Sequence, residues 1–481
     1  MGAMSTLLKN TLYLTVASVA QKVIAFVYFT LVANTIGKAS QGDYFLALSV
    51  TTILTVVSDW GLSSVLIREV AKTPSDAVRL VRSTLGLKIP LILLAALGSV
   101  GLALLLHYDR QIVQLVAFAT LILAADAISL TFFGVLRGLQ NLRYESLGIF
   151  VGQILTATFG LVALQISPSL TVLIFALILG SVWNAIFSAT RVAKHLGWRA
   201  LVPAFDPAKA RQLMRFAFAF AMASLFVKVY SYIDSIFLKQ FIGGTAVGTY
   251  SIAYKITYAF QFLPMAFVGG LYPALAARFG KNDKEGLRQL FDDAIWYTGI
   301  LAVPIVFGIA SLASIVVPRL YPTYLESIGP LQILIFVLLP LFLDFPIGSL
   351  LNAAHRQNTK AVIMGCTMVV SVVLNALLIP RLGIPGASVS AVVSFSFMMI
   401  AGLCFVPRII SYSVSDFLRR LTPIFLSGLL MLCVVLLIKS HLPVLITIGV
   451  GGGVYVLALF LSKAVTGEHL RSLRHLFRPS V

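Results

Sequence analysis

The feature that most constrains this chain is a succession of long apolar runs separated by short polar segments. A membrane-spanning helix needs about 20 mostly apolar residues, and lipid cannot hydrogen-bond a bare backbone. Composition agrees, because 59% of the residues are hydrophobic, 11% are charged and the mean hydropathy is +0.98. An ordinary soluble domain carries roughly 25% charged residues. The sequence therefore predicts an all-α, polytopic integral membrane protein.

About fourteen runs are long enough to span. They cover residues 11–36, 43–67, 84–107, 112–137, 147–166, 169–190, 212–238, 247–272, 295–317, 327–350, 359–379, 384–407, 418–438 and 442–462. The first run is long enough to span, so no cleavable signal peptide is expected. The sequence thus predicts a multi-pass protein that begins without a secretory leader.

The basic residues test this arrangement. If the N-terminus lies in the cytoplasm, the Lys- and Arg-rich segments 68–82 and 191–211 fall inside, whereas "HYDRQ" and "QISPS" fall outside. This asymmetry is the one expected of membrane topology. The net charge of +19 is then explained by topology and by attraction to anionic lipid rather than by nucleic acid. Both termini are expected in the cytoplasm.

No polar segment is long enough for a soluble domain. The longest are 191–211 and the amphipathic, charge-mixed stretch 280–294, "GKNDKEGLRQLFDDA". We expect the second to lie as a helix along the inner membrane surface. The alternative is a plain solvated linker.

An internal repeat divides the chain. "IGKASQGDYFLAL" at 36–48 matches "IGGTAVGTYSIAY" at 242–254, and a gapless alignment extends the match back to residues 17 and 223. The identities include a Lys, a Tyr and two Gly, which chance among apolar helices explains poorly, although coincidence is the alternative. Six spans separate the copies, so both have the same orientation, as in transporters built from parallel repeats.

The repeat predicts two pseudo-symmetric six-helix lobes followed by two further helices. The lobes are residues 1–200 and 201–411, and residues 412–481 hold the last two helices and a basic cytoplasmic tail. Gly37 and Gly243 are expected to end the first helix of each lobe in a left-handed turn. Tyr44 and Tyr250 are expected at the outer membrane interface, where Tyr is favoured.

The candidate site follows from charges inside the spans, since an ionised side chain at mid-bilayer costs at least ~2.5–3.5 kcal/mol. Lys22 and Lys228 occupy matching positions in the repeat, and Ser18 and Ser224 lie four residues earlier on the same helical face. An ammonium beside a hydroxyl suits a phosphate. We expect these four residues to line a central cavity together with Lys255. The alternative is that each Lys is a structural tether paired with an Asp.

The other charged residues have less definite roles. Asp59 and Asp234 are expected either to neutralise the lysines or to carry a coupling Na⁺ or H⁺, with a structural ion pair as the alternative. For Asp126 and Asp344 a structural role is favoured. Lys88 is expected to extend its ammonium to the inner membrane surface. A basic cluster at inner helix ends reflects topology or forms a cytoplasmic entrance for a phosphate; it consists of Arg137, Arg143, Arg356 and Lys360.

The sequence shows no sign of an enzyme. It contains no HExxH motif, no Walker A loop and no Ser-centred elbow, and the three Cys residues form no metal-binding pattern. We therefore expect no catalytic residues, no metal and no cofactor. Any driving force would come from an ion gradient, the membrane potential or the substrate gradient.

Several stretches resemble a known family. They are "NTLYLTVASVAQKVIAFVYFTLVANTIGKASQGDYFLAL", "SDWGLSSVLIREVAK", "YIDSIFLKQFIGGTAVGTYSIAYKI", "LYPTYLESIGPLQILI" and "RLGIPGASVSAVVSF". Over nearly its full length the chain resembles the polysaccharide transporter (Wzx-like, O-antigen flippase) family of the multidrug/oligosaccharidyl-lipid/polysaccharide exporter superfamily. The resemblance implies six-plus-six lobes and two extra helices, in agreement with the repeat.

The resemblance also implies a function. Such a protein moves undecaprenyl-diphosphate-linked oligosaccharide from the cytoplasmic to the outer leaflet of the bacterial inner membrane, by alternating access, for lipopolysaccharide or other surface polysaccharide. Polysaccharide polymerase and chain-length proteins are implied partners, and nucleic acid is not. Lys22 and Lys228 fit the role of diphosphate ligands, although the basic cavity residues of the family do not occupy fixed positions.

Two alternatives remain open from the sequence. One is an ion-coupled small-molecule or multidrug antiporter of the same superfamily. Cationic drugs need acidic binding positions, and the first span has Lys22 and no acid. The other is a scaffold for polysaccharide assembly enzymes, which the buried charges disfavour because they would destabilise it.

Overall fold

The computed structural model describes residues 2–465, with side chains described for 17–206, 210–265 and 270–465. Within this range the chain forms α-helices and short 3-10 helices and no strand, which confirms the all-α prediction. Residues 466–481 of the predicted basic tail lie outside the described residues.

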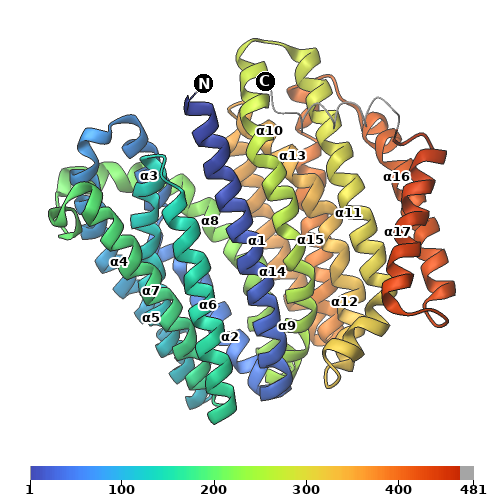
Figure 1. Ribbon diagram of the computed structural model, residues 1–481, viewed down its shortest axis with the longest axis horizontal. Coiled ribbons are helices and arrows are strands. Elements are labelled where there is room, and N and C mark those ends of the chain that lie inside the picture. Colours follow the sequence, from blue (N-terminus) through green and yellow to red (C-terminus); the bar gives the residue numbers. More distant parts are fainter. Residues whose placement is uncertain (1, 466–481) are drawn as a thin grey trace. The chain divides into compact units, whose positions relative to one another are not determined.

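The helices that form the first part of the chain are shown in blue to green in Figure 1. They are α1 Gly2–Ile36, α2 Lys38–Asp59, α3 Leu62–Lys72, α4 Ala77–Leu105, α5 Arg110–Gly138, α6 Arg143–Ile166, α7 Leu170–Leu196, α8 Pro207–Phe241 and α9 Gly244–Tyr258. The later helices are α10 Phe262–Gly280, α11 Lys284–Leu320, α12 Ile328–Leu334, α13 Leu338–Ala353, α14 Gln357–Leu382, α15 Ile384–Leu403, α16 Val414–Ile438 and α17 Val444–Leu461.

The number of spans agrees with the sequence. Among the described residues, twelve helical segments are long and apolar enough to cross a membrane. Two bent pairs bring the number to fourteen if each pair is one span; they are Lys38–Asp59 with Leu62–Lys72 and Gly244–Met265 with Gly270–Gly280. Each pair is bent by 42° and begins within one copy of the repeat. The duplication therefore extends to a bend in the second helix of each copy.

Packing divides the chain into two compact units. The first contains the chain up to Ser251 together with Met368–Ala387, and the second contains Ile252–Thr367 and the chain from Ser388 onward. These units are described separately below. The lobe boundaries predicted from the repeat stay a prediction.

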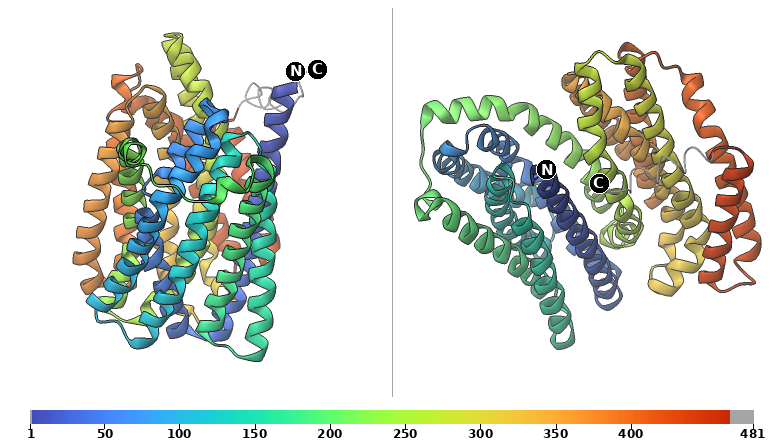
Figure 2. Two further views of the ribbon diagram at one scale, coloured as in Figure 1. Left: turned by 90° about the vertical axis from the view of Figure 1, so that its left-hand side faces the viewer. Right: turned by 45° about the horizontal axis from the view of Figure 1, so that its top comes forward.

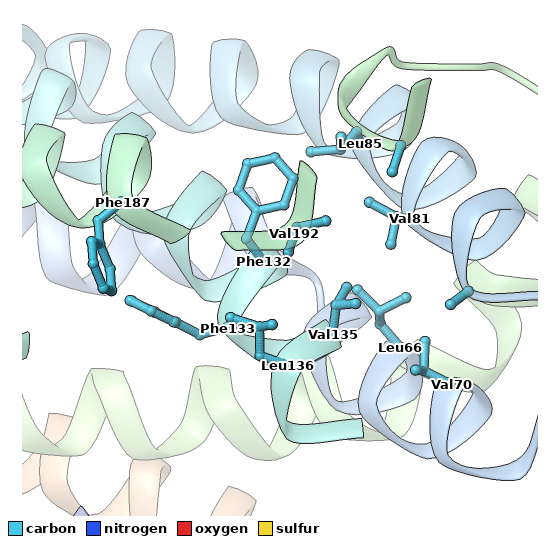
Figure 3. Packing of buried hydrophobic residues seen from close by; sticks show 12 residues of the cluster. Leu66, Val70, Val81, Leu85, Phe132, Phe133, Val135, Leu136, Phe187 and Val192 are labelled. Carbon is cyan, nitrogen blue, oxygen red and sulfur yellow. The ribbon is translucent and has the colours of Figure 1, made fainter. Parts of the chain in front are cut away.

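In the first unit, α5 is the central packing element. Phe132, Phe133, Val135 and Leu136 of α5 are buried against side chains from α3, α4 and α7 (Figure 3). Between α6 and α7 the contacts are made by small residues, since a Cβ on Gly152 would lie 3.2 Å from the Gly180 oxygen. Lipid supplies no hydrophobic drive between spanning helices, so close approach through small residues provides the packing energy.

The repeated motif forms a close helix crossing within the first unit. Gly37 and Gly243 have positive φ, 80° and 118°, at the helix ends as predicted, although Gly37 with ψ 167° is extended and not in the predicted left-handed turn. A Cβ on Gly42 would lie 1.9 Å from the Gly244 oxygen, and one on Gly248 would lie 2.0 Å from the Lys38 oxygen. The backbones of α2 and α9 are thus in direct contact where the two copies meet.

The same crossing buries the two tyrosines of the repeat, and their position at the outer interface stays a prediction. Tyr44 is 5% exposed and Tyr250 is fully buried, so both rings pack inside the protein and do not face lipid headgroups. The small residues beside them bring the helices close enough to cover both rings. The hydroxyl of Tyr250 instead donates to Asp234 Oδ2 at 2.5 Å.

In the second unit, α11 is one continuous helix of 37 residues. At 1.5 Å per residue it is roughly 55 Å long, which exceeds the ~30 Å of the hydrocarbon layer. Most of the stretch 280–294 is the start of this continuous helix, which begins at Lys284. The prediction of a separate surface helix was therefore wrong. The physical reason is burial, because Leu287, Phe291 and Ile295 are at most 2% exposed.

Helices α11, α16 and α17 pack side by side in the second unit (Figures 1 and 2). Tyr455 of α17 donates to the Ile300 oxygen of α11 at 3.1 Å. In the same unit Lys360 of α14 lies 2.6 Å from each carboxylate oxygen of Asp344 in α13. The structural role predicted for Asp344 is thus supported by an ion pair.

Candidate functional site

A cavity of about 400 Å³ lies inside the first unit, with walls from α2, α5, α6, α7 and α8. Its size is within the range of small-molecule sites. Its polar lining residues are Thr55, Ser58, Asp59, Asp126, Ser129, Glu145, Asn184, Ser224 and Lys228, and its apolar lining includes Leu123, Leu130, Phe133 and Ile149. The cavity therefore joins three carboxylates, one ammonium, one amide and four hydroxyls.

The corner between α2 and α3 positions one wall of the cavity. Trp60 and Gly61 both have positive φ, at 45° and 71°. A Cβ on Gly61 would lie 2.7 Å from both the Ala217 oxygen and the Phe220 Cβ of α8. Only glycine fits this left-handed turn at such close approach. The "DWG" stretch thus sets α8, with Lys228 and Ser224 one turn apart, against the end of α2.

Asp59 is paired at the base of the cavity. Lys88 of α4 is 1% exposed and its Nζ lies 2.6 Å from Asp59 Oδ1. The same ammonium donates to Ser63 Oγ at 2.9 Å and to the Ala127 oxygen at 3.1 Å. All three N–H donors of the ammonium are therefore satisfied.

Glu145 is also paired. It is 3% exposed, and Arg137 donates to it from both Nε and Nη2, with Nε 2.5 Å from Oε2. The nearby amide of Asn184 is held between α6 and α7, since a Cβ on Gly152 would lie 2.7 Å from its Nδ2. Its Oδ1 is buried and accepts no hydrogen bond from a described residue. The amide oxygen is thus an acceptor available at the cavity wall.

Two charges on the wall have no ion-pair partner among the described residues: those of Lys228 and Asp126. Lys228 lies over the ring of Tyr232, with its Nζ 5.8 Å from the ring centroid. With Lys88 and Arg137 included, three cations balance three carboxylates. The cavity is therefore neutral as a whole and presents one ammonium and one carboxylate to a ligand.

The structure brings together some of the predicted residues and not others. Lys228, Ser224 and Asp59 line one cavity. Lys22 is exposed on α1, Ser18 is half-buried on the same helix, and neither lines it. Asp234 is buried and accepts hydrogen bonds from Tyr250 and from the Ser235 amide and hydroxyl.

The remaining predicted residues lie elsewhere. Lys255 is exposed on α9, and Arg356 is half-buried after α13. Arg143 is exposed and lies over the ring of Tyr144, with its Cζ 4.8 Å from the centroid. Arg137 and Lys360, assigned from the sequence to the same basic cluster, each hold a carboxylate on a different pair of helices.

Sequence reasoning missed Lys88, and the prediction that its ammonium reaches the inner surface was wrong. The prediction placed the start of the helix at residue 84, whereas α4 begins at Ala77. Lys88 therefore lies about three turns inside the helix. Asp126, Glu145 and Asn184 were missed as cavity residues because no local motif surrounds them. For Asp126 and Asn184 the available signal was a polar side chain within an apolar run, whereas Glu145 lies just before the run 147–166.

Comparison with known proteins identifies the family. Residues 7–279 match the sequence profile of the family described as "Polysaccharide biosynthesis protein", and residues 219–377 match that of MatE. The first match covers more than half of the chain. The chain belongs to the polysaccharide biosynthesis protein family.

Two relatives and one solved structure show how far the similarity extends. "Uncharacterized membrane protein MJ1068" of Methanocaldococcus jannaschii is 24% identical, over 92% of each chain. "Probable low-salt glycan biosynthesis flippase Agl15" of Haloferax volcanii is 20% identical, over 81% of each chain. The inward closed structure of the lipid II flippase MurJ has a TM-score of 0.77 at 15% identity and covers 92% of this chain and 97% of its own. The chain therefore has the fold of this flippase structure.

Proposed function

We propose that the protein is a flippase that moves undecaprenyl-diphosphate-linked oligosaccharide from the cytoplasmic to the outer leaflet of the bacterial inner membrane, for surface polysaccharide such as O-antigen. The observation that carries the proposal is Lys228, the one cation in the lining of the first unit's cavity, which has no ion-pair partner among the described residues. An unpaired ammonium beside the Ser224 hydroxyl suits a phosphate oxygen.

The rest of the lining suits a sugar. Asp126 and the Asn184 oxygen accept hydrogen bonds, and Ser58, Ser129 and Thr55 both donate and accept them. A glycosyl diphosphate carries anionic oxygens at one end and many hydroxyls at the other. The cavity thus offers a partner for each end, while the prenyl tail stays in lipid. Relatives named as flippases support the same class of substrate.

The proposal includes alternating access, driven by an ion gradient or by the membrane potential. Na⁺ or H⁺ is the proposed coupling ion, and polysaccharide polymerase and chain-length proteins are the proposed partners. In this scheme Asp126 is the carboxylate on the cavity wall that no basic side chain of the described residues neutralises. A small-molecule antiporter remains the competing function, and the experiment below separates the two.

The test follows lipid-linked oligosaccharide to the outer leaflet in a strain that lacks its own flippase. Lys228→Gln and Lys22→Ala are compared singly and together, with Lys228→Arg as the charge-conserving variant. We expect Lys228→Gln to lower translocation about tenfold, which corresponds to one lost charge-assisted contact, and Lys228→Arg to retain most of it.

The control is Lys281→Gln, which removes an exposed lysine that lies outside the cavity. Its translocation should match that of the wild type at equal membrane abundance. Full translocation by an abundant Lys228→Gln protein would rule out the diphosphate contact. Drug efflux without glycolipid movement would establish the antiporter instead.

A further inference from the structure

The second unit contains a separate mixed-charge cavity of about 730 Å³. It lies where the first turns of α11, the start of α16 and the segment after α17 meet. Its charged lining residues are Glu285, Arg288, Asp292, Asp416, Arg419, Arg420 and Lys463, and its aromatic lining residues are Trp296 and Tyr412. None of these residues lines the cavity of the first unit.

The length of α17 places the cavity near the membrane surface. Helix α17 has 18 residues and is therefore roughly 27 Å long, close to the ~30 Å thickness of the hydrocarbon layer. Lys463 follows two residues after its last residue, Leu461, which is 75% exposed. A site beside the end of such a helix is within reach of lipid headgroups.

The cavity is held in shape by fixed contacts. Trp296 is 2% exposed and donates from its indole nitrogen to the Ala464 oxygen at 2.8 Å, which ties the segment after α17 to α11. Lys463, just before, is in the left-handed conformation at φ 56°. Tyr412 donates to Asp292 at 3.1 Å, and burial together with that carboxylate raises the pKa of the Tyr412 hydroxyl, so it stays protonated as a donor.

Part of the charge is neutralised internally. Arg420 lies 3.1 Å from Asp292 Oδ2 and 3.1 Å from Asp293 Oδ1, and Arg288 lies 3.9 Å from Asp416 Oδ1. Among the described residues, Arg419, Lys463 and Glu285 are the charged lining residues without an ion pair. Two cations come from α16 and the segment after α17, and the carboxylate comes from the first turn of α11.

This arrangement is complementary to a headgroup that carries both a phosphate and a primary ammonium. We propose that the cavity binds the phosphoethanolamine headgroup of a membrane lipid, with the phosphate at Arg419 and Lys463 and the ammonium at Glu285. The two helices that border the cavity, α16 and α17, carry exposed apolar side chains that offer a surface for the acyl chains; they include Leu418, Leu426 and Leu457. The inference does not depend on the proposed transport function.

The test measures binding of short-chain lipids to the purified full-length protein by native mass spectrometry. Dihexanoyl phosphatidylethanolamine is compared with the choline and glycerol lipids of the same chain length and with inorganic phosphate. We expect the ethanolamine lipid to bind about tenfold more tightly than the choline lipid, whose trimethylated ammonium cannot donate to Glu285. The glycerol lipid lacks an ammonium and should therefore also bind more weakly than the ethanolamine lipid.

Variants test which residues bind the phosphate and which bind the ammonium of the headgroup. Arg419→Gln with Lys463→Gln should weaken all three lipids about tenfold, whereas Glu285→Gln should abolish only the preference for ethanolamine over choline. The matched control is Lys281→Gln with Lys284→Gln, two exposed lysines at the same end of α11 that do not line the cavity. It should leave binding unchanged.

Three results would overturn the proposal. They are equal affinity for the three lipids, unchanged binding after Arg419→Gln with Lys463→Gln, and inorganic phosphate binding as tightly as the ethanolamine lipid. The last result would assign the cavity to a free anion instead of a headgroup. Each of these results is independent of the Lys228 experiment, because that experiment measures translocation and changes a residue of another cavity.

Discussion

Lys88 and Asp59 form an ion pair, Nζ to Oδ1 2.6 Å, between α4 and the end of α2. The lysine is 1% exposed and the aspartate side chain is 21% exposed, so the pair lies between a packed helix interface and the cavity. Ser63 also donates to the same carboxylate oxygen, at 2.5 Å. The pair neutralises a carboxylate on the cavity wall and leaves the charge of Lys228 to a ligand.

Replacing Lys88 by Met should destabilise the protein strongly. The change leaves Asp59 as an uncompensated charge and removes the donor to the Ala127 oxygen. Loss of one partner of a buried pair costs about 3–5 kcal/mol. We expect a lower midpoint of thermal unfolding in detergent, followed by tryptophan fluorescence, and a lower yield of folded protein.

The double variant Lys88→Met with Asp59→Asn should recover part of that loss, because no charge is then left unpaired. Lys281→Met, at an exposed position, serves as the control and should unfold like the wild type. A Lys88→Met protein with the wild-type midpoint would show that the pair contributes nothing to folding.

The crossing of α2 and α9 should not tolerate a side chain. In Gly42→Ala the new Cβ would lie 1.9 Å from the Gly244 oxygen, and in Gly248→Ala it would lie 2.0 Å from the Lys38 oxygen. Both backbones must move apart, and overpacking of this kind costs about 1–3 kcal/mol. We expect each variant to lower the midpoint of thermal unfolding.

Gly101→Ala provides the matched control, because this helical glycine of α4 has nothing within 4 Å of a new Cβ. Its midpoint should stay the same or rise slightly, since Ala favours helix over Gly. Equal midpoints for Gly42→Ala and Gly101→Ala would contradict the close crossing.

The fold followed from the sequence because its cause is local. Length and apolarity define each span, and the alternation of basic loops tests their number. The repeat also located Gly37 and Gly243 correctly as helix-end glycines with positive φ. These features depend on residues close in sequence, so one chain is enough to find them.

The pairing of charges did not follow from the sequence, because it depends on which helices pack together. The repeat predicted Lys22 and Lys228 as equivalent site residues, yet Lys228 alone lines the cavity in the first unit. The partner of Asp59 is Lys88 on α4, a helix whose first turns were misplaced by the apolar-run criterion. Likewise, no residue near Tyr250 in the sequence indicated that its hydroxyl would donate a hydrogen bond to Asp234.

The two tyrosines of the repeat should respond differently to loss of the hydroxyl. Tyr250 donates to Asp234, which is 5% exposed, so Tyr250→Phe leaves a buried carboxylate short of a donor. The equivalent Tyr44 makes no hydrogen bond to a described residue through its hydroxyl. We expect Tyr250→Phe to cost about 1–3 kcal/mol and Tyr44→Phe to cost little.

Thermal unfolding of the two variants in the same detergent compares them directly. Tyr44→Phe is the internal control, because it removes the same atom from the same position of the motif. A loss of stability in Tyr44→Phe equal to that in Tyr250→Phe would show that the carboxylate contact is not the cause.

Asp126 should set the affinity of the first unit's cavity for anions. It is the carboxylate of the wall without an ion pair among the described residues, and it lies in the same cavity as Lys228. Asp126→Asn removes one negative charge and keeps the side-chain shape. At an effective dielectric of about 20 the gain in binding free energy for a bound anion is on the order of 1 kcal/mol, roughly fivefold in affinity.

Calorimetry with a soluble prenyl diphosphate measures this change in affinity. Asp109→Asn, an exposed position outside the cavity, is the control and should bind like the wild type. Equal or weaker binding by Asp126→Asn would contradict the prediction that this carboxylate repels the diphosphate.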